Sequence, residues 1–384
     1  MMPPSRPCVL MTADAVGGVW VFATSLARAL AGCGYRVHLA VLGPPPNSQQ
    51  IAGLEATEGV EVDSTDLAVE WLDPEGNDLD RAFDRLAAIE RRIRPDLVHL
   101  NSFREAIAGW RAPVLVTAHS CVWSWWRACR GEMPAEARWH SYRKHVEAGL
   151  AAANMWVAPT EAFRRTIRSI YAPPTEGAVV WNGVELPEAI GAEEKQPVIL
   201  AAGRLWDEAK NISVLSAASK HIEWPIRIAG PVRGEDGIER RFHAGRLQML
   251  GPLAREAVIA EMQRAAIFAA PARYEPFGLA VLEAAAAGCA LLLADIPTFR
   301  ELWSGAAWFA DPADPSAIRA GLERLCGDEA LRRSLQQAAR QRSRRYSVAT
   351  MANRYRSLYA RLLGADPAQQ QPAQVDAMHA GASA

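Results

Sequence analysis

Hydrophobic positions along this chain alternate between short continuous apolar runs and longer stretches with helical spacing. The runs cover residues 8–12, 36–42, 96–100, 113–119, 155–159 and 178–183 in the first half, and 198–203, 225–230, 247–251, 266–272 and 290–295 in the second. Residues 19–34 are typical of the stretches between them, because their apolar positions recur at helical spacing up to a glycine. Apolar runs separated by amphipathic helices predict an α/β fold whose parallel sheets are covered on both faces.

The alternation is interrupted by a segment rich in proline, glycine and charge at residues 185–197. Because the same alternation restarts afterwards, we interpret this segment as a linker between domains. We expect Rossmann-like domains at residues 1–185 and 197–345, a C-terminal helix at 346–364 that packs back toward the first domain, and a disordered tail at 365–384.

The composition describes a globular protein with no strong electrostatic bias. The chain has 384 residues, half of them hydrophobic, and a formal net charge of −1. This balance gives no electrostatic reason to expect nucleic acid as a partner. The six cysteines show no paired metal-ligand spacing, so we expect reduced thiols and no metal site.

The sequence predicts a cytoplasmic protein, because the first residues lack the apolar run of a signal peptide and no segment resembles a membrane span. Arginine-rich stretches at 138–145 and 340–347 are typical of solvated helix faces. They leave open a peripheral contact with the inner face of the membrane.

Two carboxylates, Glu275 and Glu283, lie in an otherwise apolar segment that runs from strand through loop to helix. Ligands of parallel α/β domains collect at the carboxyl ends of strands, which is where Glu275 is expected. Pro276 suits the first turn of a helix and would leave the following backbone amides free to bind an anion or a hydroxyl. Each glutamate alone is also explained as a first-turn or solvated acid. Together they favour acceptance of hydrogen bonds from vicinal hydroxyls.

The stretch "YEPFGLAVLEAAAAGCALL" resembles the Glu-x7-Glu signature of retaining glycosyltransferases with the GT-B fold, of the group-1, family-4 type. The resemblance implies two Rossmann-like domains with parallel sheets facing a central cleft. It implies that Glu275 contacts hydroxyls of the donor sugar, assisted by the backbone amides of Phe277, Gly278 and Leu279. By the same resemblance, Glu283 holds the ribose hydroxyls of the nucleotide.

Arg204 and Lys210 follow the first strand of the second half, around a turn before a helix. An arginine and a lysine at a strand edge suit the stabilisation of a departing diphosphate without a metal. The alternative is that both pair with Asp207 and Glu208 between them, as weak surface ion pairs do. The pattern also resembles the Gly-Arg-Leu…Lys element of the same family.

Gly17 and Gly18 precede the first helix, but the loop is not G-x-G-x-x-G, which argues against a nicotinamide site. The two glycines are explained either by a tight turn or by the family's similar loop, which closes over donor phosphates and acceptor. His119 follows a strand at a position where the family's histidine approaches the transferred sugar. Ser120 stands where an aspartate commonly follows in the family.

Trp123, Trp125 and Trp126 lie within four residues, so they cannot all face one way in a regular helix or strand. They are either core residues or apolar faces for the sugar rings or lipid portion of an acceptor. We place them, with Gly17, on the acceptor side.

The sequence thus predicts an enzyme that moves a sugar from a nucleoside diphosphate sugar to a hydroxyl of a glycan, lipid-linked or small acceptor, without metal or other cofactor. The residues expected at the reacting centre are Arg204, Lys210, Glu275 and His119, and those expected to bind the donor are Gly18, Phe277, Gly278, Leu279 and Glu283. Two alternatives stay open, a catalytically silent carbohydrate-binding or scaffold protein and a nucleotide-sugar epimerase. Donor base, sugar, acceptor, linkage and oligomeric state are left undetermined.

Overall fold

The computed structural model describes residues 6–15, 17–185, 195–234, 239 and 247–364. Within these residues the strands form a seven-stranded sheet of order β3-β2-β1-β4-β5-β6-β7 and a six-stranded sheet of order β10-β9-β8-β11-β12-β13, and paired strands run parallel in both. The strands are β1 (Cys8–Asp14), β2 (Arg36–Leu42), β3 (Val60–Ser64), β4 (Leu97–Leu100), β5 (Val114–Thr117), β6 (Met155–Ala158), β7 (Ala178–Val179), β8 (Gln196–Ala202), β9 (Ile226–Ala229), β10 (Leu247–Gly251), β11 (Ala265–Ala270), β12 (Ala290–Ala294) and β13 (Trp308–Ala310).

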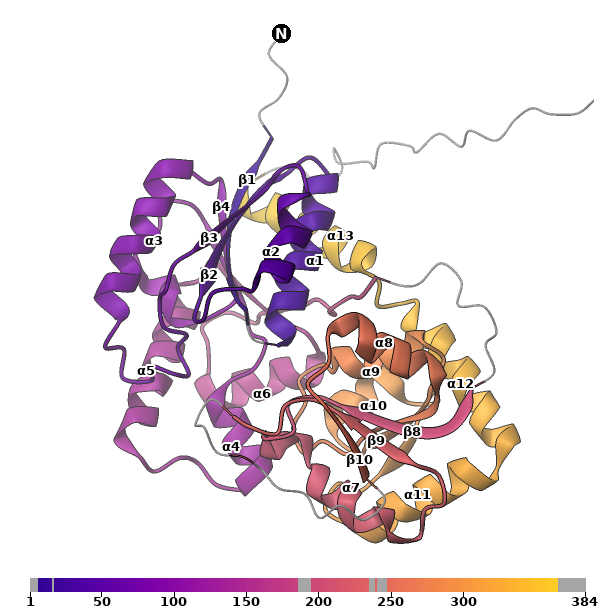
Figure 1. Cartoon of the computed structure of the whole chain (residues 1–384). Coiled ribbons are helices and arrows are strands. Elements are labelled where there is room, and N and C mark those ends of the chain that lie inside the picture. The colour runs from indigo at the N-terminus through magenta and orange to yellow at the C-terminus, as the bar shows by residue number, and fades with distance from the viewer. Residues whose placement is uncertain (1–5, 16, 186–194, 235–238, 240–246, 365–384) are drawn as a thin grey trace, which may run out of the picture.

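Helices connect the strands and cover the sheets (Figure 1). Those that follow strands of the first sheet are α1 (Gly18–Gly32), α2 (Ser48–Glu55), α3 (Leu79–Ile93), the 3₁₀ turn η1 (Arg104–Ile107), α4 (Val122–Arg130), α5 (Ala137–Ala152) and α6 (Glu161–Tyr171). Those that follow strands of the second are η2 (Glu208–Lys210), α7 (Ile212–Ala218), η3 (Ser219–His221), α8 (Arg255–Arg264), α9 (Leu279–Ala286), α10 (Pro297–Trp303), α11 (Pro315–Gly327), α12 (Glu329–Ser343) and α13 (Val348–Leu362).

Each sheet buries both of its faces, which explains the continuous apolar runs. In β1, Val9 belongs to the apolar cluster shared with α1 and α13, whereas Leu10 belongs to the cluster on the opposite face. In β8, Leu200 and Ile199 divide in the same way between the two faces of the second sheet. Successive side chains of a strand point to opposite faces, so a strand covered on both sides has no polar alternation. The predicted α/β class with two Rossmann-like parallel sheets is confirmed.

The sequence did not predict β3 or β13, which are short strands at the sheet edges. Strand β7 covers only two residues, fewer than the predicted run. Most of the predicted linker and the whole of the predicted tail lie outside the described residues.

Helix α13 packs against α1 beside the first sheet, although α12 before it packs against the second (Figure 1). Its buried face meets the core of the first sheet through two tyrosines. Tyr359 Oη lies 2.6 Å from His99 Nδ1, and Tyr355 Oη lies 3.1 Å from Thr117 Oγ1. Because aromatic rings bury large apolar areas and these hydroxyls have partners, the last helix is firmly seated on the first half of the chain.

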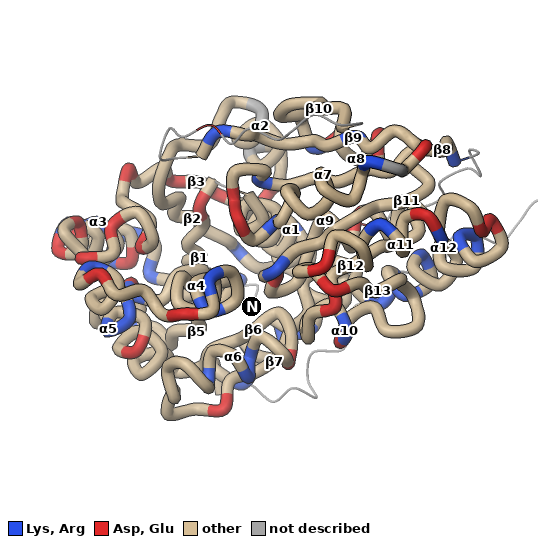
Figure 2. The backbone as a smooth tube through the Cα atoms, turned by 90° about the horizontal axis from the view of Figure 1, so that it is seen from below, with Lys and Arg blue, Asp and Glu red and all other residues tan. Residues whose placement is uncertain are grey.

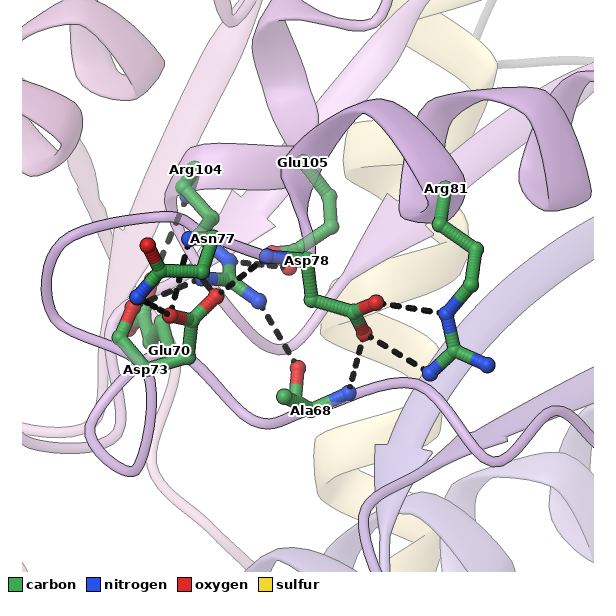
Figure 3. A network of polar contacts seen from close by, with 8 residues as sticks. All are labelled: Ala68, Glu70, Asp73, Asn77, Asp78, Arg81, Arg104 and Glu105. Carbon is green, nitrogen blue, oxygen red and sulfur yellow. Dashed lines mark hydrogen bonds and ion pairs between the residues drawn. The ribbon is translucent and has the colours of Figure 1, made fainter.

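A buried arginine holds the long loop between β3 and α3 (Figure 3). The Arg104 guanidinium donates to Asp73 Oδ2 at 2.9 Å, to Glu105 Oε1 at 2.9 Å and to the Ala68 carbonyl at 2.8 Å. Glu70 Oε2 accepts from the backbone amides of residues 103 and 104. Burial, reinforced by the neighbouring Glu105 carboxylate, raises the pKa of Glu70 to about 7.

Among the described residues, Lys and Arg are interspersed with Asp and Glu along both halves of the chain (Figure 2). Over the described ranges, no helix has the length and apolar character that a bilayer crossing requires. All six cysteines are free thiols, and Cys8, Cys121 and Cys289 are buried.

Candidate functional site

Lys210 and Glu275 form an ion pair that joins two loops of the second sheet. Lys210 Nζ lies 2.6 Å from Glu275 Oε2, and both side chains are mostly buried. Lys210 ends η2 after β8, and Glu275 follows β11, the neighbouring strand. The backbone amide of Arg273 also donates to the Ala209 carbonyl at 2.8 Å. The alternative that Lys210 pairs with an adjacent acid is wrong, because its partner comes from the next strand edge.

Arg204 follows the same strand as Lys210 and lies near the glycine loop of the first half of the chain. Its Nη2 is 3.4 Å from Asp207 Oδ2, and 43% of its side chain is exposed, so the guanidinium stays accessible. A Cβ placed on Gly17 would be 4.0 Å from Arg204 Nη1, and one on Gly18 would be 3.5 Å from Leu279 Cδ1. The glycine loop after β1 therefore faces the predicted phosphate and sugar loops of the second sheet.

Helix α9 begins at Leu279, three residues later than the sequence predicted. Gly278 stands before it with φ +90°, a left-handed conformation that ends the loop and keeps Pro276 outside the helix. Phe277 is buried and its ring contacts Tyr346 at a centroid distance of 6.0 Å. Of the three predicted amides, only that of Leu279 belongs to the first helical turn.

Glu283 lies within α9 and forms an ion pair with Arg255 of α8. Its Oε1 accepts from Arg255 Nε at 3.0 Å and Nη2 at 2.8 Å. Only 14% of the Glu283 side chain is exposed, so it is not the solvated residue of the alternative interpretation. Burial raises the pKa of Glu283, and Arg255 acts in the opposite direction.

His119 follows β5 and is oriented by Asn101 after β4. His119 Nε2 lies 2.8 Å from Asn101 Oδ1, while Asn101 Nδ2 donates to the Thr12 carbonyl. Since the amide oxygen can only accept, Nε2 carries the proton and Nδ1 is the accepting nitrogen. Burial lowers the pKa of His119 to about 3, so the imidazole is neutral near pH 7.

The three tryptophans on α4 face different surroundings. Trp123 is 4% exposed and donates to the Trp139 carbonyl at 3.0 Å, so its prediction as an acceptor-side residue is corrected: it belongs to the core. Trp125 donates from Nε1 to Asp207 Oδ1 at 2.8 Å, and so joins a helix that follows a strand of the first sheet to a loop of the second. Trp126 is partly exposed and lies under the Arg130 guanidinium at 4.1 Å.

Sequence reasoning missed three residues that hold the predicted site together: Asn101, Arg255 and Tyr274. Asp207 was named only as the alternative partner of Arg204, and the structure shows that pair. Tyr274 directly precedes Glu275 in the glutamate segment, and Asn101 directly follows β4, so position in the sequence could have drawn attention to both. Nothing local marks Arg255. Among the residues described, no group of three or more His, Cys, Asp or Glu is arranged to hold a metal ion.

The arrangement of two parallel sheets is similar to that of known glycosyltransferases. Sucrose-phosphate synthase (tll1590) from Thermosynechococcus elongatus superposes with a TM-score of 0.75 at 18% identity, over 94% of this chain and 100% of that one. Anabaena Alr3699/HepE, in complex with UDP and glucose, gives 0.71 at 16% identity over 93% and 100%. WaaG, a glycosyltransferase involved in lipopolysaccharide biosynthesis, gives 0.69 at 14% identity over 92% and 99%. The fold is GT-B.

Two family models match the sequence itself. Glycosyltransferase Family 4 matches residues 16–188, and Glycosyl transferases group 1 matches residues 184–342. The protein is a GT-B glycosyltransferase, and the chain belongs to the group-1, family-4 type. No curated protein sequence matches the chain.

Proposed function

We propose that this protein is a metal-independent, retaining glycosyltransferase that uses a nucleoside diphosphate sugar. The observation that carries the proposal is the convergence of Arg204, Lys210 and Glu275 at neighbouring strand edges, opposite the glycine loop at Gly17. Family membership supports sugar transfer. The similar Anabaena protein, described in complex with UDP and glucose, supports a nucleotide-sugar donor.

The ion pair between Lys210 and Glu275 keeps both side chains in position before a donor binds. A diphosphate carries more negative charge than one carboxylate, so it would draw Lys210 toward itself. Glu275 would then present its oxygens to hydroxyls of the sugar. Glu283 keeps Oε2 for the ribose hydroxyls, because Arg255 binds only Oε1.

Two cationic side chains at the diphosphate would neutralise its charge, as a metal ion does in other transferases. Arg204 offers a planar fork and Lys210 a compact charge, and both stabilise negative charge as it develops on the leaving group. The bond from the anomeric carbon to the diphosphate oxygen breaks as the acceptor oxygen bonds to the same face. The acceptor proton passes to the departing diphosphate.

His119 acts in this scheme as a neutral group that accepts a hydrogen bond at Nδ1 from a hydroxyl of donor or acceptor. The carboxylate that commonly follows this histidine in the family is a serine here, and Asn101 supplies the orientation instead.

The six free thiols support the cytoplasm as the compartment of this protein. Peripheral contact with the inner face of the membrane stays a prediction.

A thermal-shift panel tests the proposal with uridine, guanosine and adenosine diphosphates and their sugars, with and without EDTA. We expect stabilisation by one base in the presence of EDTA, followed by transfer whose product keeps the anomeric configuration in NMR spectra. Stabilisation that EDTA abolishes would contradict metal independence, and an inverted product would contradict retention. A changed sugar released without acceptor indicates an epimerase. Glycan binding without any response to nucleotides indicates a silent binding protein.

A further inference from the structure

Helix α4 of the first domain is bound by both donor loops of the second. The first bond comes from Tyr274, whose Oη accepts from the Cys121 amide at 3.2 Å and lies 2.8 Å from Ser124 Oγ. Ser124 Oγ donates its own proton to the Cys121 carbonyl at 2.9 Å, so it accepts the hydrogen bond from the Tyr274 hydroxyl. The Tyr274 hydroxyl thus accepts one hydrogen bond and donates another at the start of α4.

The ring of Tyr274 is seated in the first domain, against the core that contains Phe163, at a centroid distance of 6.3 Å. Its neighbours in sequence are held as well. Thr298 Oγ1 donates to the Glu275 carbonyl at 2.6 Å, and Thr160 Oγ1 donates to the Pro276 carbonyl at 3.0 Å. The backbone that carries Glu275 is therefore fixed from both domains.

The second bond comes from Trp125 to Asp207, which is 8% exposed. Asp207 Oδ1 accepts from Trp125 Nε1 at 2.8 Å and from the Ala209 amide at 3.0 Å. Its other oxygen, Oδ2, is the one that faces Arg204 Nη2. The indole N–H and the amide together orient the carboxylate, and the carboxylate orients the guanidinium.

We propose that Trp125 and Tyr274 are positioning residues through which helix α4 orients the two side chains proposed to bind the donor. Trp125 orients Arg204 through Asp207, and Tyr274 orients Glu275 through the backbone that the two residues share. This inference rests on the proposed function, since it assigns Arg204 to the diphosphate and Glu275 to the sugar. It makes the geometry of the donor site in the second domain depend on the first domain.

The two positions predict different binding defects. Trp125→Phe keeps an aromatic ring and loses the N–H, so it should weaken both the plain nucleoside diphosphate and the nucleotide sugar, by roughly tenfold. Tyr274→Phe should weaken the nucleotide sugar and leave the nucleoside diphosphate unchanged. Trp110→Phe is the matched control, because Trp110 Nε1 also donates at 2.8 Å, to the Glu105 carbonyl, away from the donor loops.

A double-mutant cycle by calorimetry decides whether Trp125 acts through Arg204. In the Arg204→Ala background, Trp125→Phe should have no further effect on diphosphate affinity. Additive losses, or equal losses in the Trp110→Phe control, would overturn the inference. The inference would also be overturned if Trp125→Phe and Tyr274→Phe both bound the nucleoside diphosphate and the nucleotide sugar with wild-type affinity. Failure of the wild-type protein to bind any nucleoside diphosphate would instead overturn the proposed function, and melting temperatures identify variants that are simply unfolded.

Discussion

Lys210 Nζ lies 2.6 Å from Glu275 Oε2, although the two residues are 65 positions apart in the sequence. The pair joins the loop after β8 to the loop after β11, which are neighbouring strands of the second sheet. Opposite charges this close and this little exposed hold each other in place. The cation proposed for the diphosphate and the acid proposed for the sugar are thus preorganised as one unit.

Replacing Arg204 by alanine should lower kcat by about 10²–10³-fold, because one preorganised donor to a developing charge is worth about 2.7–4 kcal/mol. Steady-state kinetics with the nucleotide sugar identified by thermal shift measures the loss. Arg324→Ala removes an arginine that pairs with Asp328 at the surface of α11, and should leave kcat unchanged. Equal activities of the two variants would refute the assignment.

Glu283→Ala should abolish most of the thermal stabilisation by a nucleoside diphosphate, because the ribose hydroxyls lose their acceptor. Glu256→Ala removes an exposed acid from the first turn of α8 and serves as the control. The ribose assignment is wrong if the shift of the Glu283 variant equals that of the wild type.

Gly278→Ala should destabilise the protein more than Gly305→Ala. Both glycines have positive φ, +90° and +79°, so each substitution carries a left-handed strain of roughly 1–2 kcal/mol. Only the Cβ at Gly278 would meet a ring atom of Phe299 at 3.0 Å and Glu275 Cγ at 3.3 Å. Urea unfolding compares the free energies. We expect weaker nucleotide-sugar binding for the Gly278 variant alone, and equal binding by both would count against Gly278 at the donor site.

Glu70→Gln should change how stability depends on pH. Burial and Glu105 raise the Glu70 pKa from 4.5 to about 7, so between these values the folded state holds a proton that the unfolded chain has lost. The free-energy contribution of Glu70 therefore falls as pH rises through this interval. Relative to the wild type, the glutamine variant should gain stability from pH 4.5 to 7, on the order of 1–3 kcal/mol.

The measurement for Glu70 is the difference between the two unfolding free energies at each pH. His99 and His119, whose pKa values burial lowers, act in the opposite direction, but they do so in both proteins and cancel in the difference. Glu61→Gln, at a mostly exposed acid, is the control. A difference that stays constant over the interval would show that Glu70 is ionised throughout.

Several elements were predictable because they depend on local pattern. The continuous apolar runs identified eleven strands of the two sheets, since residues buried on both faces leave a direct mark on composition. The edge strands β3 and β13 were missed, because neither is a continuous buried apolar run: β3 alternates valine with acids and buries only Val60, and β13 has three residues of which only Ala310 is buried. The start of α9 was placed too early, because Pro276 is a helix-start signal whereas the conformation of Gly278 is decided by its surroundings.

The sequence by itself determined the two parallel sheets, the glutamate segment, and the loops that carry the arginine, the lysine and the histidine. Only the tertiary structure decided the partners. Trp125 meets Asp207 across 82 positions, and Tyr274 meets Cys121 across 153. The periodicity of hydrophobic residues shows which side of a helix or strand is buried, because each buried position favours an apolar residue independently of its distant neighbours. A hydrogen bond between domains depends on how two sheet edges are oriented toward each other, and no local pattern contains that orientation.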